Sequence, residues 1–241
     1  MKKLFLLFAA ASLIGAQSCS YFGFISVDPT GQYVAKKIQT KSFENVSVSS
    51  GFELIVTQDS LQTLSVETYE NIHQYIVAEV VGNTLEVHPE EGISFAGDPK
   101  VKVHLSSKFL NKLSSSGGGR INLNNGWTGD ELSISLSGGG KVFGKVVLQS
   151  LELDMSGGSE SDIEGVAEYL NIGSSGGSVH KHFSLLTKKC RLDMSGGASA
   201  EVNVSEKLNV DASGGTYISY KGNPEISSEL SGGSSIEKVE L

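Results

Sequence analysis

A Ser-Gly-Gly triplet recurs at a nearly constant interval through the second half of the chain. The intervals are 21, 19, 19, 20, 18 and 18 residues, and the seven triplets begin at Ser116, Ser137, Ser156, Ser175, Ser195, Ser213 and Ser231. A period of this size is typical of a solenoid, in which each repeat is one coil that buries its apolar side only by stacking on its neighbours.

Apolar and polar residues alternate before each triplet. The positions five before the serine are mostly apolar, as are those three before it, and they include Leu132, Leu151, Leu170, Cys190 and Leu208 in the first set and Ile134, Leu153, Ile172, Leu192 and Val210 in the second. Because side chains alternate with period two along a strand, both columns should point into one core. Cys190 replaces a leucine there, so we expect a buried thiol rather than a reactive one.

The glycine pair follows the point at which each strand must turn a corner. Glycine adopts a positive φ without steric cost and lets neighbouring coils approach closely, so Gly157 and Gly196 should be intolerant of larger residues. A coil of 18 to 21 residues accommodates about three short strands with their turns. Parallel crossovers are right-handed, and the drifting interval argues against a left-handed helix of strict hexapeptides. The repeats therefore predict an all-β, right-handed parallel β-helix over residues 111–241.

The chain before the repeats is β-like but less regular. Residues 41–110 contain several alternating segments, with a turn expected at Gly82-Asn83 and a short turn or helical piece at Asn71–Tyr75. Residues 19–40, which include Pro29 and Gly31, are predicted to form a tether that covers the open end of the solenoid.

The N-terminal residues have the pattern of a secretory signal peptide over residues 1–18. Lys2 and Lys3 precede an apolar stretch from Leu4 to Ile14, which is too short for a stop-transfer helix. The segment Leu13–Cys19 resembles a bacterial lipobox, although Gln17 departs from the usual pattern. We therefore expect Cys19 to carry a lipid that anchors the protein to the outer membrane. The alternative is an ordinary signal peptide with a chance cysteine near its end.

Three ordered segments resemble the putative auto-transporter adhesin head GIN domain family. They are FENVSVSSGFELIVTQ at Phe43–Gln58, GNTLEV at Gly82–Val87 and LSSSGG at Leu113–Gly118. The resemblance covers about residues 41–241 and implies a β-helix-like fold and a location in the cell envelope. It implies no catalytic residues, so none is assigned.

One column could carry chemistry. Two positions before the serine stand Ser114, Ser135, Asp154, Gly173, Asp193, Asp211 and Glu229. Alternation points this column outward, and neighbouring coils lie about 4.8 Å apart, so Asp193, Asp211 and Glu229 should form an acidic ladder. We interpret it first as a solvated face. Cation or glycan binding is a second interpretation. Catalysis is a third, because a retaining glycosidase needs two carboxyl groups about 5 Å apart.

Other candidate sites are weaker. His180 and His182 lie on one side of a strand and could hold a metal, but no third ligand is apparent, so we expect a surface pair. Only Gly157–Asp162 approaches the calcium-binding glycine and aspartate repeat, and it is incomplete. We expect no cofactor and no bound metal. The net charge of −8 makes nucleic acid an unsuitable partner.

These patterns favour a non-enzymatic, lipid-anchored envelope protein. Its partners would be the membrane, through the lipid, and a glycan or protein bound by the solenoid in the manner of an adhesin. The alternative is an enzyme acting on polysaccharides, a glycoside hydrolase or lyase built on a β-helix.

Overall fold

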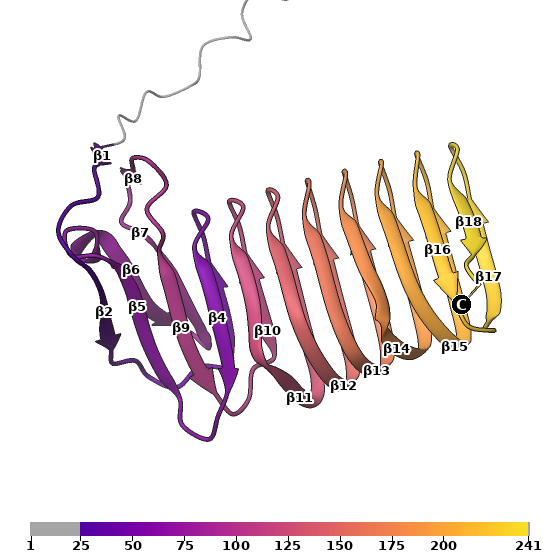
Figure 1. Cartoon of the computed structure of the whole chain (residues 1–241), viewed down its shortest axis with the longest axis horizontal. Coiled ribbons are helices and arrows are strands. Elements are labelled where there is room, and N and C mark those ends of the chain that lie inside the picture. The colour runs from indigo at the N-terminus through magenta and orange to yellow at the C-terminus, as the bar shows by residue number, and fades with distance from the viewer. Residues whose placement is uncertain (1–24, 241) are drawn as a thin grey trace, which may run out of the picture.

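The stacked coils of the chain form one long β-solenoid in a computed structural model that describes residues 25–240 (Figure 1). Each long strand pairs in parallel with the strand that follows it in the chain. Tight turns follow one edge of the flattened solenoid and broader bends follow the opposite edge. The strands of this part are β10 (Lys112–Ser115), β11 (Arg120–Leu136), β12 (Lys141–Met155), β13 (Glu160–Ser174), β14 (Val179–Met194), β15 (Ser199–Ala212), β16 (Tyr217–Lys221), β17 (Glu225–Leu230) and β18 (Ser235–Lys238).

The alternating apolar columns fill the interior of the coils. Leu132, Leu151, Leu170, Cys190 and Leu208 are in register on successive strands, and all are buried. The Cys190 side chain is 2% exposed, and burial raises the pKa of its thiol well above the usual range. The predicted all-β solenoid and the burial of Cys190 are therefore confirmed.

The two glycines of a triplet have different roles at the corner. Gly196 has a φ of +86°, and a Cβ there would lie 2.6 Å from the carbonyl oxygen of Gly176 on the preceding coil. Gly197 has open space beyond its Cα atom. Its backbone N–H donates a hydrogen bond of 2.8 Å to the Gly176 carbonyl oxygen. The first glycine therefore permits close stacking, whereas the second contributes only its backbone.

A hydroxyl group closes several of these corners. Ser159 Oγ donates to the carbonyl oxygen of Ser156 at 2.7 Å, and Thr216 Oγ1 donates to that of Ser213 at 2.9 Å. Each bond joins the residue after the triplet to the serine that begins it. The small residue at this fourth position thus satisfies a carbonyl group that the turn leaves without a neighbouring strand.

The N-terminal part continues the same coils with inserted antiparallel strands. Parallel pairing joins β3 (Asn45–Val48) to β7 (Thr84–Pro89) and β10, and joins β4 (Glu53–Gln58) to β9 (Lys102–Ser107) and β11. Antiparallel pairing joins β5 (Thr63–Tyr69) to β9 and to β2 (Tyr33–Ile38), and β6 (Ile76–Val81) to β7. The 3-10 helix η1 (His73–Tyr75) and the β6–β7 turn lie where the sequence predicts them. A separate pair joins β1 (Ile25–Val27) to β8 (Ile93–Phe95).

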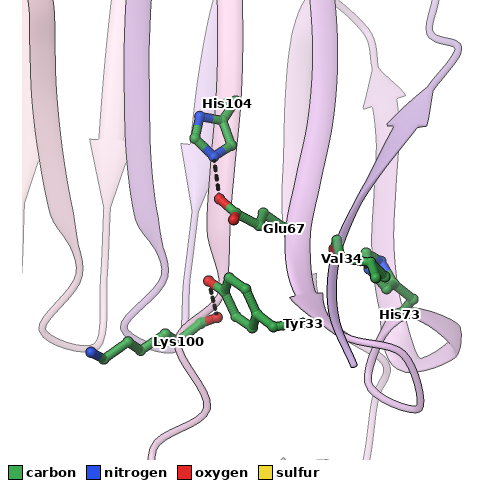
Figure 2. Close-up of polar contacts among 6 residues, drawn as sticks. All are labelled: Tyr33, Val34, Glu67, His73, Lys100 and His104. Atoms are coloured by element: carbon green, nitrogen blue, oxygen red, sulfur yellow. Dashed lines mark hydrogen bonds and ion pairs between the residues drawn. The ribbon is translucent and has the colours of Figure 1, made fainter. Parts of the chain in front are cut away.

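Strand β2 is fastened across the N-terminal end of the solenoid by side chains as well as by its backbone (Figure 2). The Tyr33 hydroxyl donates to the Lys100 carbonyl oxygen at 2.9 Å, and His73 Nε2 lies 3.0 Å from the Val34 carbonyl oxygen. Burial, and then the nearby Glu67 carboxylate, raise the pKa of Tyr33 to about 12, so the hydroxyl stays protonated. Beside it, His104 Nε2 lies 2.8 Å from Glu67 Oε2 on the neighbouring strand.

The expectation that His180 and His182 form a surface pair is wrong. Both side chains are fully buried, and both rings lie 2.9 Å from the Ser161 hydroxyl on the preceding coil. His180 also contacts the Ser174 hydroxyl at 3.1 Å. The two histidines stand in core columns on β14, opposite Ala200 and Val202. A polar network of serines therefore replaces part of the apolar core here.

Burial keeps both histidines neutral. It lowers the pKa of His180 to about 3, with a further contribution from His182, and that of His182 to about 4. Below about pH 6.5, the histidines of the unfolded chain, with pKa values near 6.5, bind protons, whereas the buried histidines of the folded chain stay neutral. Stability is therefore highest above about pH 6.5 and falls as the pH falls from there toward the folded pKa values.

We expect Gly196→Ala to lower the free energy of unfolding by more than about 1 kcal/mol, because the new Cβ meets backbone at a positive φ. Gly197→Ala is the matched control, with an expected change within about 0.5 kcal/mol. Denaturant melts of the three proteins measure this difference. Equal stability of the two variants would contradict the division of roles between the glycines.

We also expect the free energy of unfolding to fall by about 1.6 kcal/mol for each buried histidine between pH 6.5 and pH 5. Glu160 does not contribute to the change in this pH range. Hydrogen bonds from Lys141 and then Lys181 lower its pKa to about 2, so the stabilisation from its ionised form is lost only at lower pH. Denaturant melts across the window should show that His180→Gln with His182→Gln removes this slope. A slope that survives in the double variant, or disappears in the partly exposed control His88→Gln, would refute the assignment.

Candidate ligand-binding face

A shallow groove of about 540 Å³ runs across successive coils on one outer face of the solenoid. Its walls come from the residue at the start of each triplet and from the residue two positions before it, together with the intervening residues Ser115, Leu136, Met155 and Ser174. We call this surface the serine–acid face. The side chains of these two columns in the groove are Ser47, Ser114, Ser116, Ser135, Ser137, Asp154, Ser156, Ser175 and Asp193.

The strand register places the predicted acidic column in one row along this face. The row continues from Ser47 through Ser114, Ser135, Asp154, Gly173, Asp193 and Asp211 to Glu229. Asp193, Asp211 and Glu229 stand on consecutive coils, whereas Gly173 separates Asp154 from them. All four acidic side chains are exposed.

Asp154 leans into the gap left by Gly173. A Cβ at Gly173 would lie 2.8 Å from Asp154 Oδ1, so the carboxylate occupies the space that a side chain at position 173 would fill. Along this row the groove is lined by serines up to Ser135 and carries the carboxylates of Asp154 and Asp193 beyond it.

The geometry of this face suits recognition better than acid–base chemistry. A glycosidase that uses two carboxyl groups keeps one of them protonated by placing it in a shielded, apolar environment. The four carboxylates here lie on an open face, where they can accept hydrogen bonds from hydroxyl or amide groups. Among residues 25–240, no three His, Cys, Asp or Glu side chains are grouped so that they could hold a metal ion.

The structure also presents a feature that the repeat pattern does not reveal. Phe109 lies between β9 and β10 with 65% of its surface exposed, and hollows open on both sides of it. Phe109 lies outside the alternating columns, so the repeat pattern does not predict whether its side chain is buried or exposed. In the sequence, this site is marked only by an apolar residue in a connection between strands.

The predicted lipid attachment site, Cys19, lies outside the described residues. Within the described part of the chain, no helix is both long and apolar enough to span a membrane.

Several solved structures have the same fold. A putative adhesin from Bacteroides fragilis is 24% identical, with a TM-score of 0.82 over 88% of this chain and 100% of its own. A putative lipid binding protein from Parabacteroides distasonis is 22% identical, with a TM-score of 0.75 over 90% of this chain and 100% of its own. A putative adhesin from Parabacteroides merdae is 21% identical, with a TM-score of 0.72 over 89% and 99% of the two chains.

No curated protein matches the chain. Residues 42–224, however, match the family described as "putative auto-transporter adhesin, head GIN domain". The match covers well over half of the sequence and includes both the irregular N-terminal part and most of the repeats. The chain therefore belongs to this adhesin head GIN domain family.

Proposed function

We propose that this protein is a non-enzymatic, lipid-anchored component of the outer membrane that binds a glycan or protein ligand on its serine–acid face. The observation that supports this most directly is the groove itself, which follows one row of small and acidic side chains across several coils. A solenoid offers such a face because every coil adds the same surface at the same spacing. Family membership supports an adhesin-like role in the cell envelope.

The position of Cys19 in the sequence sets how close a lipid anchor would bring the folded chain to the membrane. Five residues lie between Cys19 and Ile25, the first residue of β1, and this connection spans at most about 20 Å. A lipid on Cys19 would therefore hold β1 and its partner β8 close to the membrane surface. The coils that carry Asp193, Asp211 and Glu229 are remote from that point along the solenoid (Figure 1).

The alternative function is hydrolysis or elimination on a polysaccharide. The close approach of the acidic residues on neighbouring coils is the observation that favours it, since about 4.8 Å separates adjacent strands. Their exposure argues against it, because water-exposed carboxyl groups lack the environment that holds a proton at neutral pH.

Replacing Cys19 with serine should release the protein from the membrane, because the lipid acceptor is lost. Cell fractionation followed by immunoblotting measures the distribution, and metabolic labelling with a fatty acid tests for the lipid directly. Cys190→Ser is the matched control and should leave both results unchanged. Retention of the Cys19→Ser variant in the membrane fraction would rule out anchoring through this residue.

Asp211→Asn should abolish ligand-induced stabilisation without unfolding the protein. Removing one of three stacked carboxylates relieves repulsion across adjacent coils, so the unliganded variant should melt at the same temperature or slightly higher at low salt, and salt should erase the difference. Melting in the presence of calcium and of acidic or neutral oligosaccharides tests for ligands.

Asp162→Asn provides the control, since Asp162 is an exposed aspartate on a different strand segment. A ligand shift that persists in Asp211→Asn would contradict the proposed face. Cleavage of an oligosaccharide by the parent protein, abolished in Asp211→Asn, would instead establish the enzymatic alternative.

A further inference from the structure

Phe109 is an exposed aromatic side chain in the connection between β9 and β10. This connection lies on the edge opposite the tight turns (Figure 1). A large apolar side chain that is 65% exposed loses the stabilisation that burial would give. Lys108 Nζ lies 4.9 Å from the centre of the ring. The exposed ring is therefore an apolar surface next to a charged group.

Two hollows flank this ring. One has a volume of about 380 Å³ and is bounded by Asn111, Trp127, Asp130 and Glu131 among others. The second has a volume of about 270 Å³ and is bounded by Glu44, Gln62 and Asn83 among others. Lys108 and Phe109 belong to the walls of both hollows. The ring is thus a shared wall between two small recesses.

The segment that carries the ring is held rigidly. Ser107 Oγ donates to the Phe109 carbonyl oxygen at 2.9 Å, and Gln58 Nε2 donates to the Lys108 carbonyl oxygen at 3.3 Å. The Asn111 backbone N–H donates to the Glu44 carbonyl oxygen at 2.8 Å. Because the backbone is fixed on both sides of Phe109, a ligand would not have to order this segment on binding.

The polar groups around the ring are also positioned in advance. Asn83 Nδ2 and Asn111 Nδ2 both donate to Glu44 Oε2, at 2.9 and 3.0 Å. The other oxygen, Oε1, receives neither of these bonds. Asp130 and Glu131 add exposed carboxylates to the larger hollow. These groups can accept hydrogen bonds from several hydroxyl groups at once.

We propose that Phe109 and its two flanking hollows form a binding site for a neutral sugar residue of a glycan. A pyranose has a flat face of C–H groups and an edge of hydroxyl groups, which match an aromatic ring bordered by carboxylates and amides. The carboxylates of Glu44, Asp130 and Glu131 outnumber the one ammonium group of Lys108 in the two hollows, so acidic glycans would be repelled. A protein partner is less suited, because stable protein interfaces bury roughly 800 Å² on each side around a desolvated centre, whereas this ring stands alone among charged groups.

This site lies apart from the serine–acid face and goes beyond the function proposed for that face. None of its residues lines the groove between the serine and acidic columns. Binding at one surface can therefore be lost while binding at the other remains.

The chain contains a natural reporter for this site. Its single tryptophan is Trp127, which is 3% exposed and lines the larger hollow. A Cβ at the neighbouring Gly129 would lie 3.9 Å from Trp127 Nε1, so the indole nitrogen lies beside a residue without a side chain. A sugar that enters the hollow should change the emission of this one fluorophore.

The test is a fluorescence titration of the full chain, in a detergent without a sugar headgroup, with maltohexaose, cellohexaose, mannohexaose and chitohexaose. We expect at least one of these neutral oligosaccharides to shift the tryptophan emission saturably. Phe109→Ala should weaken that binding by about tenfold or more, which corresponds to about 1.4 kcal/mol. Phe109→Tyr should restore it to within about threefold of the parent, because the aromatic face is kept.

Two variants serve as controls for position. Leu186→Ala removes another exposed apolar side chain, 55% exposed, and should leave the titration unchanged, as should Asp162→Asn, which changes an exposed aspartate on β13. Loss of neutral-sugar binding in Asp211→Asn with retention in Phe109→Ala would overturn the proposal and assign the glycan to the groove. The absence of saturable binding by all four oligosaccharides would overturn it as well, as would a protein ligand whose binding depends on Phe109.

Discussion

The close approach of backbone to backbone at the corners is the constraint on which the rest of this structure depends. The amide of Gly197 reaches the carbonyl oxygen of Gly176 at 2.8 Å, and the same bond recurs between Gly177 and Gly157. These bonds keep successive coils in register through the turn, so the strands on either side continue their pairing without interruption. A side chain at the first glycine would force the coils apart, and both the core columns and the outer rows would lose their alignment.

Periodic features of the chain could be predicted, whereas features that depend on a single coil could not. Leu132, Leu151 and Leu170 were assigned to the core because alternation and repeat length agree. The same alignment, extended to the fifth residue after each triplet serine, puts His180 in one column with Val142, Ser161 and Ala200. The expectation of a surface pair rests instead on the lack of a third metal ligand near His180 and His182 in the sequence. Hydrogen bonds between the Ser161 hydroxyl and both rings offset the cost of burying His180 and His182, and they connect two neighbouring coils.

The two candidate ligand sites differ in how they arise. The serine–acid face is a product of repetition, because each coil adds one residue to the row and Asp193, Asp211 and Glu229 are simply its last members. The Phe109 site is a product of irregularity, because it lies between β9 and β10, at the boundary between the N-terminal part and the regular coils. Sequence periodicity reveals the first kind of surface. The second kind requires knowledge of which side chains a non-repeating connection leaves exposed.

Because only the first glycine of these corners excludes a side chain, one edge of the solenoid offers evenly spaced positions that tolerate substitution. Cβ atoms at Gly158 and Gly197 would meet nothing within 4 Å, and those at Gly177 and Gly215 would meet only ordinary contacts at 3.9 Å. These four positions lie on consecutive coils, whose strands are about 4.8 Å apart. Side chains introduced there would project from the edge at that interval while the coils stay closed. The corner of each of these four coils is thus rigid at one residue and open to chemical variation at the next.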